Sequence, residues 1–227
     1  MQSHAIPHAR ASLSAGNLPP RFDPVVHITT GEPVALISRG MRRYGDAARF
    51  SANGFEAPAD MPADWLAEEL ERVVTEALSQ DLPTRPIHIA TPSPALLDPT
   101  ARGACLDVLH RVRACAQEIV LEFDDWVLGA ERRDLVFGLS RFKSVGFRLS
   151  IDATASWQMR SSEAIRVMID SVRVSARALF GDSSLAAHCH QLSLCGIDLI
   201  VDGARWRDAG DLAEMGALYA SRPRADA

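Results

Sequence analysis

The chain alternates short apolar runs with segments in which apolar residues recur every three or four positions. Three of the runs end in acidic residues, at Ile119–Asp125, Phe147–Asp152 and Ile197–Asp202. Such runs predict buried strands of a parallel sheet, because strands covered on both faces read as nearly continuous apolar segments. The periodic segments between them predict helices. Strands that alternate with helices favour a parallel, barrel-like α/β fold over an open sheet.

The beginning of the patterned region differs from the rest. Pro24–Ile28 and Pro33–Ser38 are predicted strands separated by the turn residues Thr29–Glu32, and this short spacing predicts an antiparallel hairpin. An Arg-rich and Gly-rich loop follows from Arg39 to Gly54. We therefore predict an α/β fold, a TIM-like (β/α) barrel with an antiparallel first strand.

Helices are expected between the later strands. Asp64 is the predicted cap of a helix whose apolar face includes Leu66, Leu70 and Val73. Further helices are predicted over Leu106–Ala116, Leu135–Phe142, Leu185–Leu194 and Asp208–Gly216, and further strands over Pro86–Thr91 and Ser171–Val174.

Composition narrows the class of protein. With 227 residues, 47% of them apolar, the chain has enough material for one α/β domain with a substantial core. The net charge of −5 argues against a basic nucleic-acid-binding surface. Four cysteines without a C-x-x-C pair indicate reduced thiols of a cytoplasmic protein, and no apolar run reaches the length of a membrane span. We expect a mobile tail over residues 1–20, one barrel domain over 21–223 and a loose end over 224–227.

Several segments, in order, resemble the motifs of one family. They are Ala35–Arg39 at the place of E-A-L-x-R, Glu122–Asp125 at E-x-T-E, Asp152–Trp157 at D-D-F-G-T-G, Val201–Arg205 at A-E-G-V-E, and Tyr219–Pro223 at a closing S-R-P. From about Arg21 to Pro223 the chain thus resembles the EAL domain, the family of cyclic di-GMP phosphodiesterases and their inactive relatives. No single motif is intact.

The departures from the family pattern concern its chemistry. The resemblance implies hydrolysis assisted by two divalent cations, which need oxygen ligands. Alanine replaces a ligand residue at three positions, and the catalytic lysine, an aspartate and the last glutamate are also substituted; the residues are Ala35, Ala90, Ala153, Arg173, Ser175 and Arg205. Glu122 and Asp152 are kept, and Asp202 is one methylene shorter than the family's glutamate. We therefore expect a degenerate member with no catalytic residue, no metal and no cofactor.

The remaining charged residues allow more than one interpretation. Five of them could still hold a nucleotide weakly: Arg39, Glu122, Asp152, Asp202 and Arg173. Alternatively, Arg39 forms an internal ion pair with Glu122 or Asp152. The cluster of Glu122, Asp124 and Asp125 is either a remnant of a metal site or a strand end that caps the next helix.

Two other groups of residues are candidates for binding a partner or a metal. Arg42, Arg43 and Arg49 form a basic loop that is either a solvated face or a partner-binding surface. His188, Cys189, His190 and Cys195 fit no standard zinc spacing. Trp157 replaces a glycine of the family's substrate loop, which counts against nucleotide binding.

The function implied is that of a non-enzymatic regulatory or scaffold protein, which acts through protein–protein contacts in cyclic di-GMP-linked or motility signalling. A non-hydrolysing cyclic di-GMP receptor is the alternative, followed by a residual phosphodiesterase. A protein partner is expected, whereas the sequence leaves a homodimer open.

Overall fold

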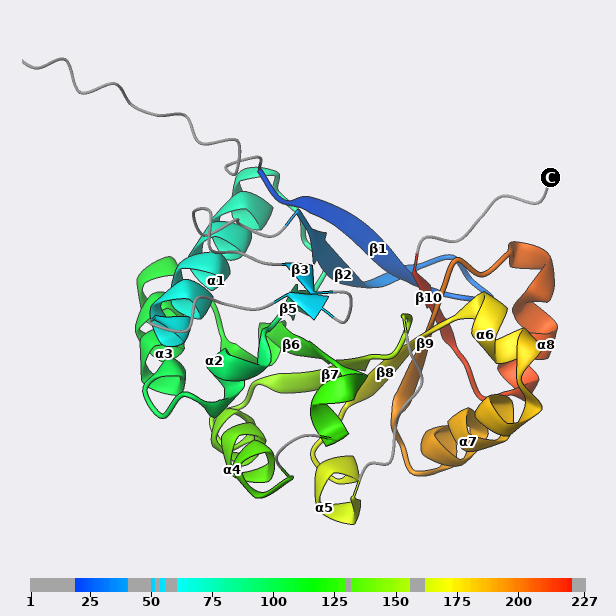
Figure 1. Ribbon diagram of the computed structural model, residues 1–227. Helices are drawn as coiled ribbons and strands as arrows, with labels where there is room; N and C mark the ends of the chain where they lie inside the picture. The colour runs from blue at the N-terminus through cyan, green and yellow to red at the C-terminus, as the bar shows by residue number, and fades with distance from the viewer. Residues whose placement is uncertain are drawn as a thin grey trace, which may run out of the picture.

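The strands close into a barrel, as Figure 1 shows. The structure is a computed structural model, and it describes residues 19–40, 50–51, 54–55, 61–129, 132–155 and 162–221. Its eight strands follow the order β1-β10-β9-β8-β7-β6-β5-β2. Their bounds are β1 Arg21–His27, β2 Pro33–Arg39, β5 Ile87–Ala90, β6 Ile119–Asp124, β7 Arg148–Asp152, β8 Ser171–Ser175, β9 Asp198–Asp202 and β10 Tyr219–Ser221. Strand β1 is antiparallel to both of its neighbours, and the remaining pairs are parallel. The predicted barrel with an antiparallel first strand is confirmed.

Side chains alternate between the two faces of the barrel wall. In β6, Leu121 and Phe123 belong to the main apolar core between the strands and the helices. The intervening Glu122 bonds instead to side chains of other barrel strands. Because successive side chains of a strand point to opposite faces, one strand supplies both the outer core and the barrel interior. The interior is unusually polar for a barrel of this kind, which is normally filled by branched apolar residues.

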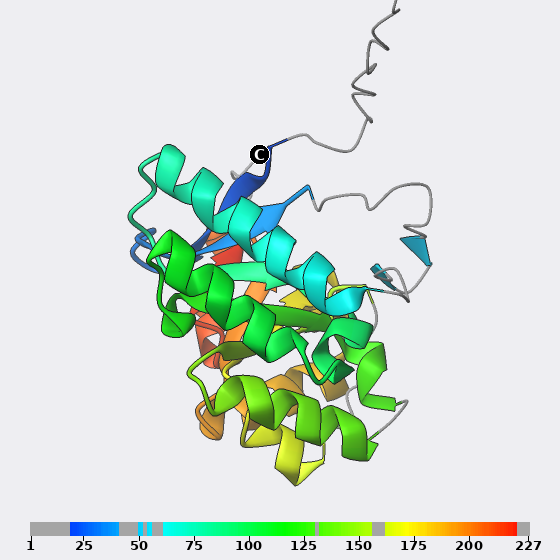
Figure 2. The ribbon, with the colours of Figure 1, turned by 90° about the vertical axis from the view of Figure 1, so that its left-hand side faces the viewer.

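The helices lie outside the barrel, and Figure 2 shows α1 and α3 packed side by side along one flank. Their bounds are α1 Pro62–Ser79, α2 Ser93–Leu97, α3 Ala101–Val112, α4 Arg132–Lys143, α5 Glu163–Arg166, α6 Ala176–Gly181, α7 Ser183–Leu194 and α8 Ala209–Glu214. In the described ranges, short 3₁₀ helices accompany them: η2 Ala116–Glu118, η3 Asp125–Gly129 and η4 Trp206–Asp208. No helix in the described ranges is long and apolar enough to cross a membrane.

Helix α1 carries the predicted apolar face, since Leu66, Leu70 and Val73 are all buried. Its start was predicted wrongly. The N-cap is Met61, and Asp64 lies inside the first turn rather than capping it. Pro62 explains the earlier start, because its fixed φ and missing N–H suit the first helical position. Asp64 remains favourable there as an acidic residue near the positive end of the helix dipole.

Other differences involve short elements. Helices α2, α5 and α6 were not predicted, since four to six residues are too few to show a helical period. Asp125 begins η3, the helix that directly follows β6, which agrees with the interpretation of Asp125 as an acidic residue at a helix N-terminus. The predicted Arg- and Gly-rich loop contains two strands, β3 Phe50–Ser51 and β4 Gly54–Phe55, which pair with each other. The predicted tail up to residue 18, the basic residues Arg42, Arg43 and Arg49, Trp157 and residues 222–227 lie outside the described residues.

Candidate functional site: a buried ion cluster in the barrel

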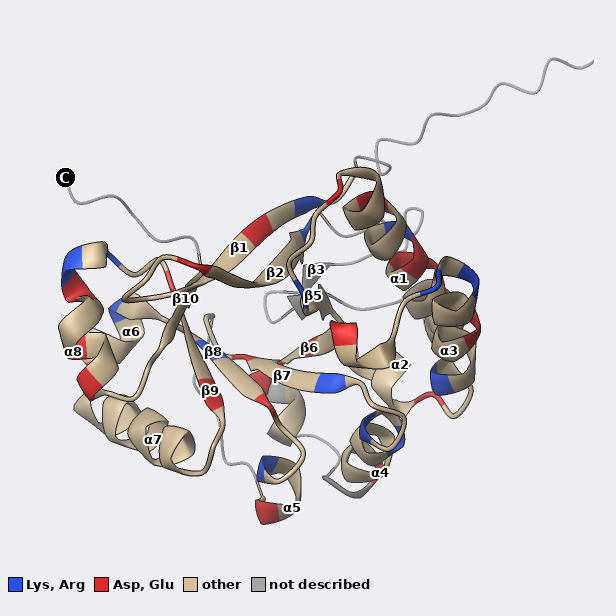
Figure 3. Ribbon diagram, turned by 180° about the vertical axis from the view of Figure 1, so that it is seen from behind, with Lys and Arg blue, Asp and Glu red and all other residues tan. Residues whose placement is uncertain are grey.

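Charged residues gather inside the barrel, toward the ends of its parallel strands. Figure 3 shows acidic and basic positions on the barrel strands β6 to β9 as well as on the outer helices. Glu122, Asp152 and Asp202 come from β6, β7 and β9, and Arg173 comes from β8 between them. Parallel pairing sets Asp124 beside Asp152 and Ser175 beside Asp202, so these strands end at about the same level. The carboxyl ends of the strands are where barrel enzymes place their active sites.

The Arg173 side chain forms the centre of this cluster. It is 2% exposed, and it reaches across β7 to Glu122, which is 4% exposed. Arg173 Nε donates to Glu122 Oε2 at 3.2 Å, and Nη2 donates to Oε1 at 2.6 Å. Arg173 Nη2 also donates a short hydrogen bond to Asp152 Oδ2. The planar guanidinium matches two carboxylate oxygens at once, which makes this one of the stronger types of ion pair.

The cluster changes the ionisation of its own members. Burial opposes ionisation of Glu122, but the Arg173 charge and a hydrogen bond from His88 outweigh it and hold the pKa of Glu122 well below its usual range. Burial and the neighbouring Glu122 charge together raise the pKa of Asp152, although Arg173 counteracts them. Burial also disfavours the charge on Arg173, yet Glu122 and Asp152 more than compensate and raise its pKa further. The paired Glu122 and Arg173 therefore remain charged in the interior.

Arg39 lies at the end of β2 and has different partners from those predicted. Its Nε donates to Asp23 Oδ2 at 3.0 Å, and its Nη2 lies 3.9 Å from Asp202 Oδ1. The expected pair with Glu122 or Asp152 is therefore wrong. The reason is the residue at position 173: Arg173 supplies the charge that Glu122 and Asp152 need. Asp202 also accepts a hydrogen bond from Ser221 Oγ at 2.8 Å, which fixes it at the β9–β10 edge.

Two positions of the site were missed or misjudged from the sequence. His88 of β5 is buried, and its Nδ1 lies 3.2 Å from Glu122 Oε2. Because a carboxylate only accepts, Nδ1 carries the hydrogen in this contact. The alternation of side-chain directions along β5 could have indicated from the sequence that His88 points into the barrel. Ser175, at the place of the family's aspartate, caps α6: its Oγ accepts from Ala178 N.

The structure separates Ala35 from the other expected site positions. Strand pairing aligns Leu36 with Ile87, whereas Glu122 is aligned with Ala90. Counted along β5, the position level with Ala35 comes four residues before the position level with Glu122. This separates the two residues by about 13 Å in the strand direction. It packs instead with Val25, Ile37 and Ile200 inside the opposite end of the barrel.

The remaining substituted positions offer no ligand atoms of their own. Ala153 is buried and extends the pairing of β7 with β8 through its N–H and the carbonyl of Arg173. Ala90 ends β5. Across the parts of the chain that the structure describes, no three His, Cys, Asp or Glu side chains are grouped to hold a metal ion. His188, Cys189 and His190 lie on α7, and Cys195 follows that helix.

The fold and the position of the cluster define an EAL-like barrel. No protein-family model matches the chain, and no curated protein matches it. Among solved structures, the chain is similar to Klebsiella pneumoniae BlrP1 in its manganese/cyclic di-GMP complex, with a TM-score of 0.67 and 15% identity over 90% of this chain and 55% of that chain. It is also similar to the EAL domain of Mycobacterium smegmatis DcpA, with a TM-score of 0.66 and 13% identity over 89% of this chain and 88% of that one.

A third similar structure is the EAL enzyme Bd1971 with cAMP and cyclic di-GMP bound, with a TM-score of 0.63 and 14% identity. This chain covers 59% of the Bd1971 chain and 55% of the BlrP1 chain, so it spans little more than half of either protein. At these identities the comparison establishes the fold, which is that of cyclic di-GMP phosphodiesterases of the EAL type.

Proposed function

We propose that this domain does not hydrolyse cyclic di-GMP and acts as a regulatory or scaffold domain through contacts with another protein. The observation that carries the first half is the buried Arg173, whose guanidinium bonds to both Glu122 and Asp152. A two-metal hydrolase needs its carboxylates free to bind divalent cations and to balance charge developing on phosphorus. Here one internal cation already bonds to two of the three aligned acids that remain, and its Nη1 lies 3.9 Å from Oδ1 of the third, Asp202.

A divalent metal does not fit this arrangement. BlrP1 was solved with manganese and with calcium beside the dinucleotide, so metals accompany the ligand in that protein. In this chain a metal at Glu122 and Asp152 would lie against the positive charge of Arg173, which the two carboxylates hold in place. Arginine also remains protonated at any accessible pH, so it is a poor proton acceptor for an attacking water. We therefore assign no catalytic step to these residues.

The second half of the proposal concerns the outer surface. When a barrel keeps its frame and the charges at the carboxyl ends of its strands are paired internally, contacts with another protein fall to the outer surface. Phe137 on α4 is 64% exposed, and Val167 after α5 is 74% exposed. Single exposed apolar residues are common on monomers, so Phe137 and Val167 are positions at which a contact can be tested by substitution. The predicted basic loop with Arg42, Arg43 and Arg49 is the other candidate contact surface.

The first test is a hydrolysis assay with magnesium or manganese, in which product is followed by chromatography. We expect no product from the full chain or from Arg173→Lys, since the lysine variant restores only one of several substituted positions. Turnover by the unmodified chain that is lost in Glu122→Gln would overturn the proposal.

The second test is an interaction screen with the full chain. A partner that binds the unmodified chain but not Arg42→Glu/Arg43→Glu or Phe137→Asp supports a contact through the outer surface. Arg102→Glu is the matched control, because Arg102 is an exposed arginine on α3, a different helix from the one that carries Phe137. A partner bound equally by every variant would show that neither surface makes the contact.

One observation favours a second function, that of a non-hydrolysing cyclic di-GMP receptor. Arg39 lies at the barrel mouth with its side chain 30% exposed, and a guanidinium suits a phosphate well. Its existing contacts with Asp23 and Asp202 would compete with such a ligand. Calorimetric titration separates the two functions: heat of binding that disappears in Arg39→Met supports the receptor, and no heat at high micromolar nucleotide excludes it.

A further inference from the structure

A second polar region lies at the opposite end of the barrel from the ion cluster. A cavity of about 120 Å³ opens there, lined by residues at the beginnings of the parallel strands. Val120, Arg148, Ser171 and Asp198 each belong to the first two residues of their strand. One water molecule needs roughly 10–15 Å³ measured in this way, so the cavity has room for a molecule of several non-hydrogen atoms.

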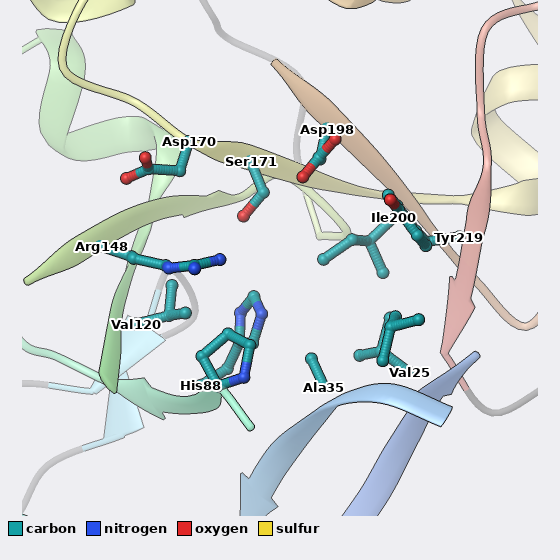
Figure 4. A pocket seen from close by; sticks show the side chains of 12 residues that line it. Val25, Ala35, His88, Val120, Arg148, Asp170, Ser171, Asp198, Ile200 and Tyr219 are labelled. Atoms are coloured by element: carbon teal, nitrogen blue, oxygen red, sulfur yellow. The ribbon is translucent and has the colours of Figure 1, made fainter. Parts of the chain in front are cut away.

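The polar side of the cavity presents hydrogen-bond donors that the protein does not use. Figure 4 shows the side chains of Arg148 and Ser171 directed into the cavity. Among the described residues, the Arg148 guanidinium forms no ion pair within 4.0 Å, although its charge counteracts the raised pKa of Asp198 in the same cavity, and the hydroxyls of Ser171 and Tyr219 have no hydrogen bond. Neighbouring Asp170 is already engaged, since both of its carboxylate oxygens lie 2.6 Å from Lys143 Nζ and one accepts from Leu149 N. Among the lining residues that the structure describes, the groups without a hydrogen bond are therefore the donors of Arg148, Ser171 and Tyr219 and one carboxylate, that of Asp198.

The other side of the cavity is apolar. Val25, Ala35 and Ile200 pack together there, and Figure 4 shows them on the side away from Arg148. The small side chain of Ala35 leaves space that a larger residue would fill. A pocket with an apolar wall facing a few convergent polar groups is the usual form of a small-molecule site.

We propose that this cavity binds a small monocarboxylate with an apolar body. The Arg148 guanidinium would pair with the carboxylate, the Ser171 and Tyr219 hydroxyls would donate to it, and the apolar body would contact Val25, Ala35 and Ile200. The carboxylate of Asp198 at the rim repels anions, so it disfavours a ligand that carries a second negative group. His88 lines this cavity and also contacts Glu122 of the Arg173 cluster, so the two sites adjoin, but the contacts proposed here use none of the charged residues of the cluster and do not depend on whether the domain binds a nucleotide.

The experiment is an NMR titration of the full chain with 3-methylbutanoate at neutral pH, in which backbone amide shifts are followed. Shifts should concentrate at the beginnings of β7, β8 and β9 and saturate in the millimolar range. The uncharged 3-methylbutanamide has the same shape and should bind at least about tenfold more weakly, because charge-assisted hydrogen bonds are lost.

Three variants assign the contacts. Arg148→Met should weaken binding of the carboxylate at least about tenfold, whereas Arg102→Met, another exposed arginine far from the cavity, should leave it unchanged. Asp198→Asn should strengthen binding by about twofold or more, since a like charge is removed. The spectrum of each variant also reports whether it is folded.

Several outcomes would overturn the proposal: no saturable shift, unchanged affinity in folded Arg148→Met, or tighter binding of 3-methylbutylamine than of the carboxylate. The last result would mean that Asp198, rather than Arg148, dominates the cavity.

Discussion

Arg173 of β8 and Glu122 of β6 are joined by two parallel hydrogen bonds that pass over the intervening strand β7. Asp152 of β7 accepts from the same guanidinium. One side chain therefore links three consecutive strands inside the barrel. A buried cation in this position costs much desolvation energy, and the compensation depends on both carboxylates remaining in place.

Replacing Arg173 with methionine should strongly destabilise the protein. The substitution keeps an unbranched stem but removes the guanidinium, which leaves Glu122 and Asp152 buried without a counter-charge. Loss of one partner of a buried pair typically costs about 3–5 kcal/mol. Urea unfolding followed by circular dichroism measures the change, and exposed Arg102→Met should lie within about 0.5 kcal/mol of the unmodified chain. A loss below about 1 kcal/mol for Arg173→Met would mean that the cluster resembles a solvated surface pair.

The pairing of Arg173 with Glu122 should appear as strong coupling in a double-mutant cycle. Glu122→Gln alone leaves the guanidinium with less negative charge around it, and Arg173→Met alone leaves the carboxylates unpaired. The double variant removes both charges and should lose at least about 1.5 kcal/mol less than the sum of the single losses. Additive losses would show that the two residues stabilise the barrel independently.

The cluster also predicts how individual carboxyls respond to acid. The folded pKa of Glu122 lies below its ordinary value of 4.5, so its stabilisation is complete above that pH and is lost as the pH falls through the folded value. The pKa of Asp152 lies above its ordinary 3.8, so that residue acts in the opposite sense and costs stability as the pH rises. Carboxyl ¹³C shifts should show Glu122 still ionised at a pH where exposed glutamates are half protonated. Titration of Glu122 near 4.5 would contradict the pairing.

The fold was more accessible from the sequence than the site. Apolar runs such as Ile119–Leu121 favour burial on both faces, so the strands and the barrel could be predicted from them. Helices α5 and α6 did not, because neither is long enough to show a period, and their positions depend on the strands that they connect.

The site required information about neighbours in space. The sequence placed Arg39, Glu122, Asp152, Asp202 and Arg173 in one region, but it could not determine which arginine meets which acid. That choice depends on side-chain direction and on strand order, since Arg173 is 51 residues from Glu122 along the chain. The contribution of His88 is also spatial, because the alternation along β5 indicates that its side chain points inward but not which residue it contacts.

The four cysteines should divide into two reactive and two protected thiols. Cys115 and Cys195 are exposed, whereas Cys105 and Cys189 are buried, and burial raises the pKa of each of the latter to about 12. Since the thiolate is the nucleophile, the buried pair should resist alkylation until the protein unfolds. Brief treatment with iodoacetamide followed by mass spectrometry should find two modifications in the native protein and four in urea. Rapid native modification of Cys105 or Cys189 would show that the helix layer opens readily.

Two glycines on helices should respond to alanine in opposite directions. Gly138 on α4 lies directly against the carbonyl of Leu96, where an added methyl group would fall well inside contact distance. Gly103 on α3 has open space around it. Gly103→Ala should therefore stabilise the protein by about 0.4–1 kcal/mol, because alanine lowers the entropy of the unfolded chain. Gly138→Ala should instead destabilise it by about 1–3 kcal/mol, because α4 must move away from α2. Urea unfolding of the two variants measures both changes in the free energy of unfolding, and so distinguishes the effect of packing from that of backbone entropy. Equal stabilisation by both would mean that the α2–α4 contact yields without cost.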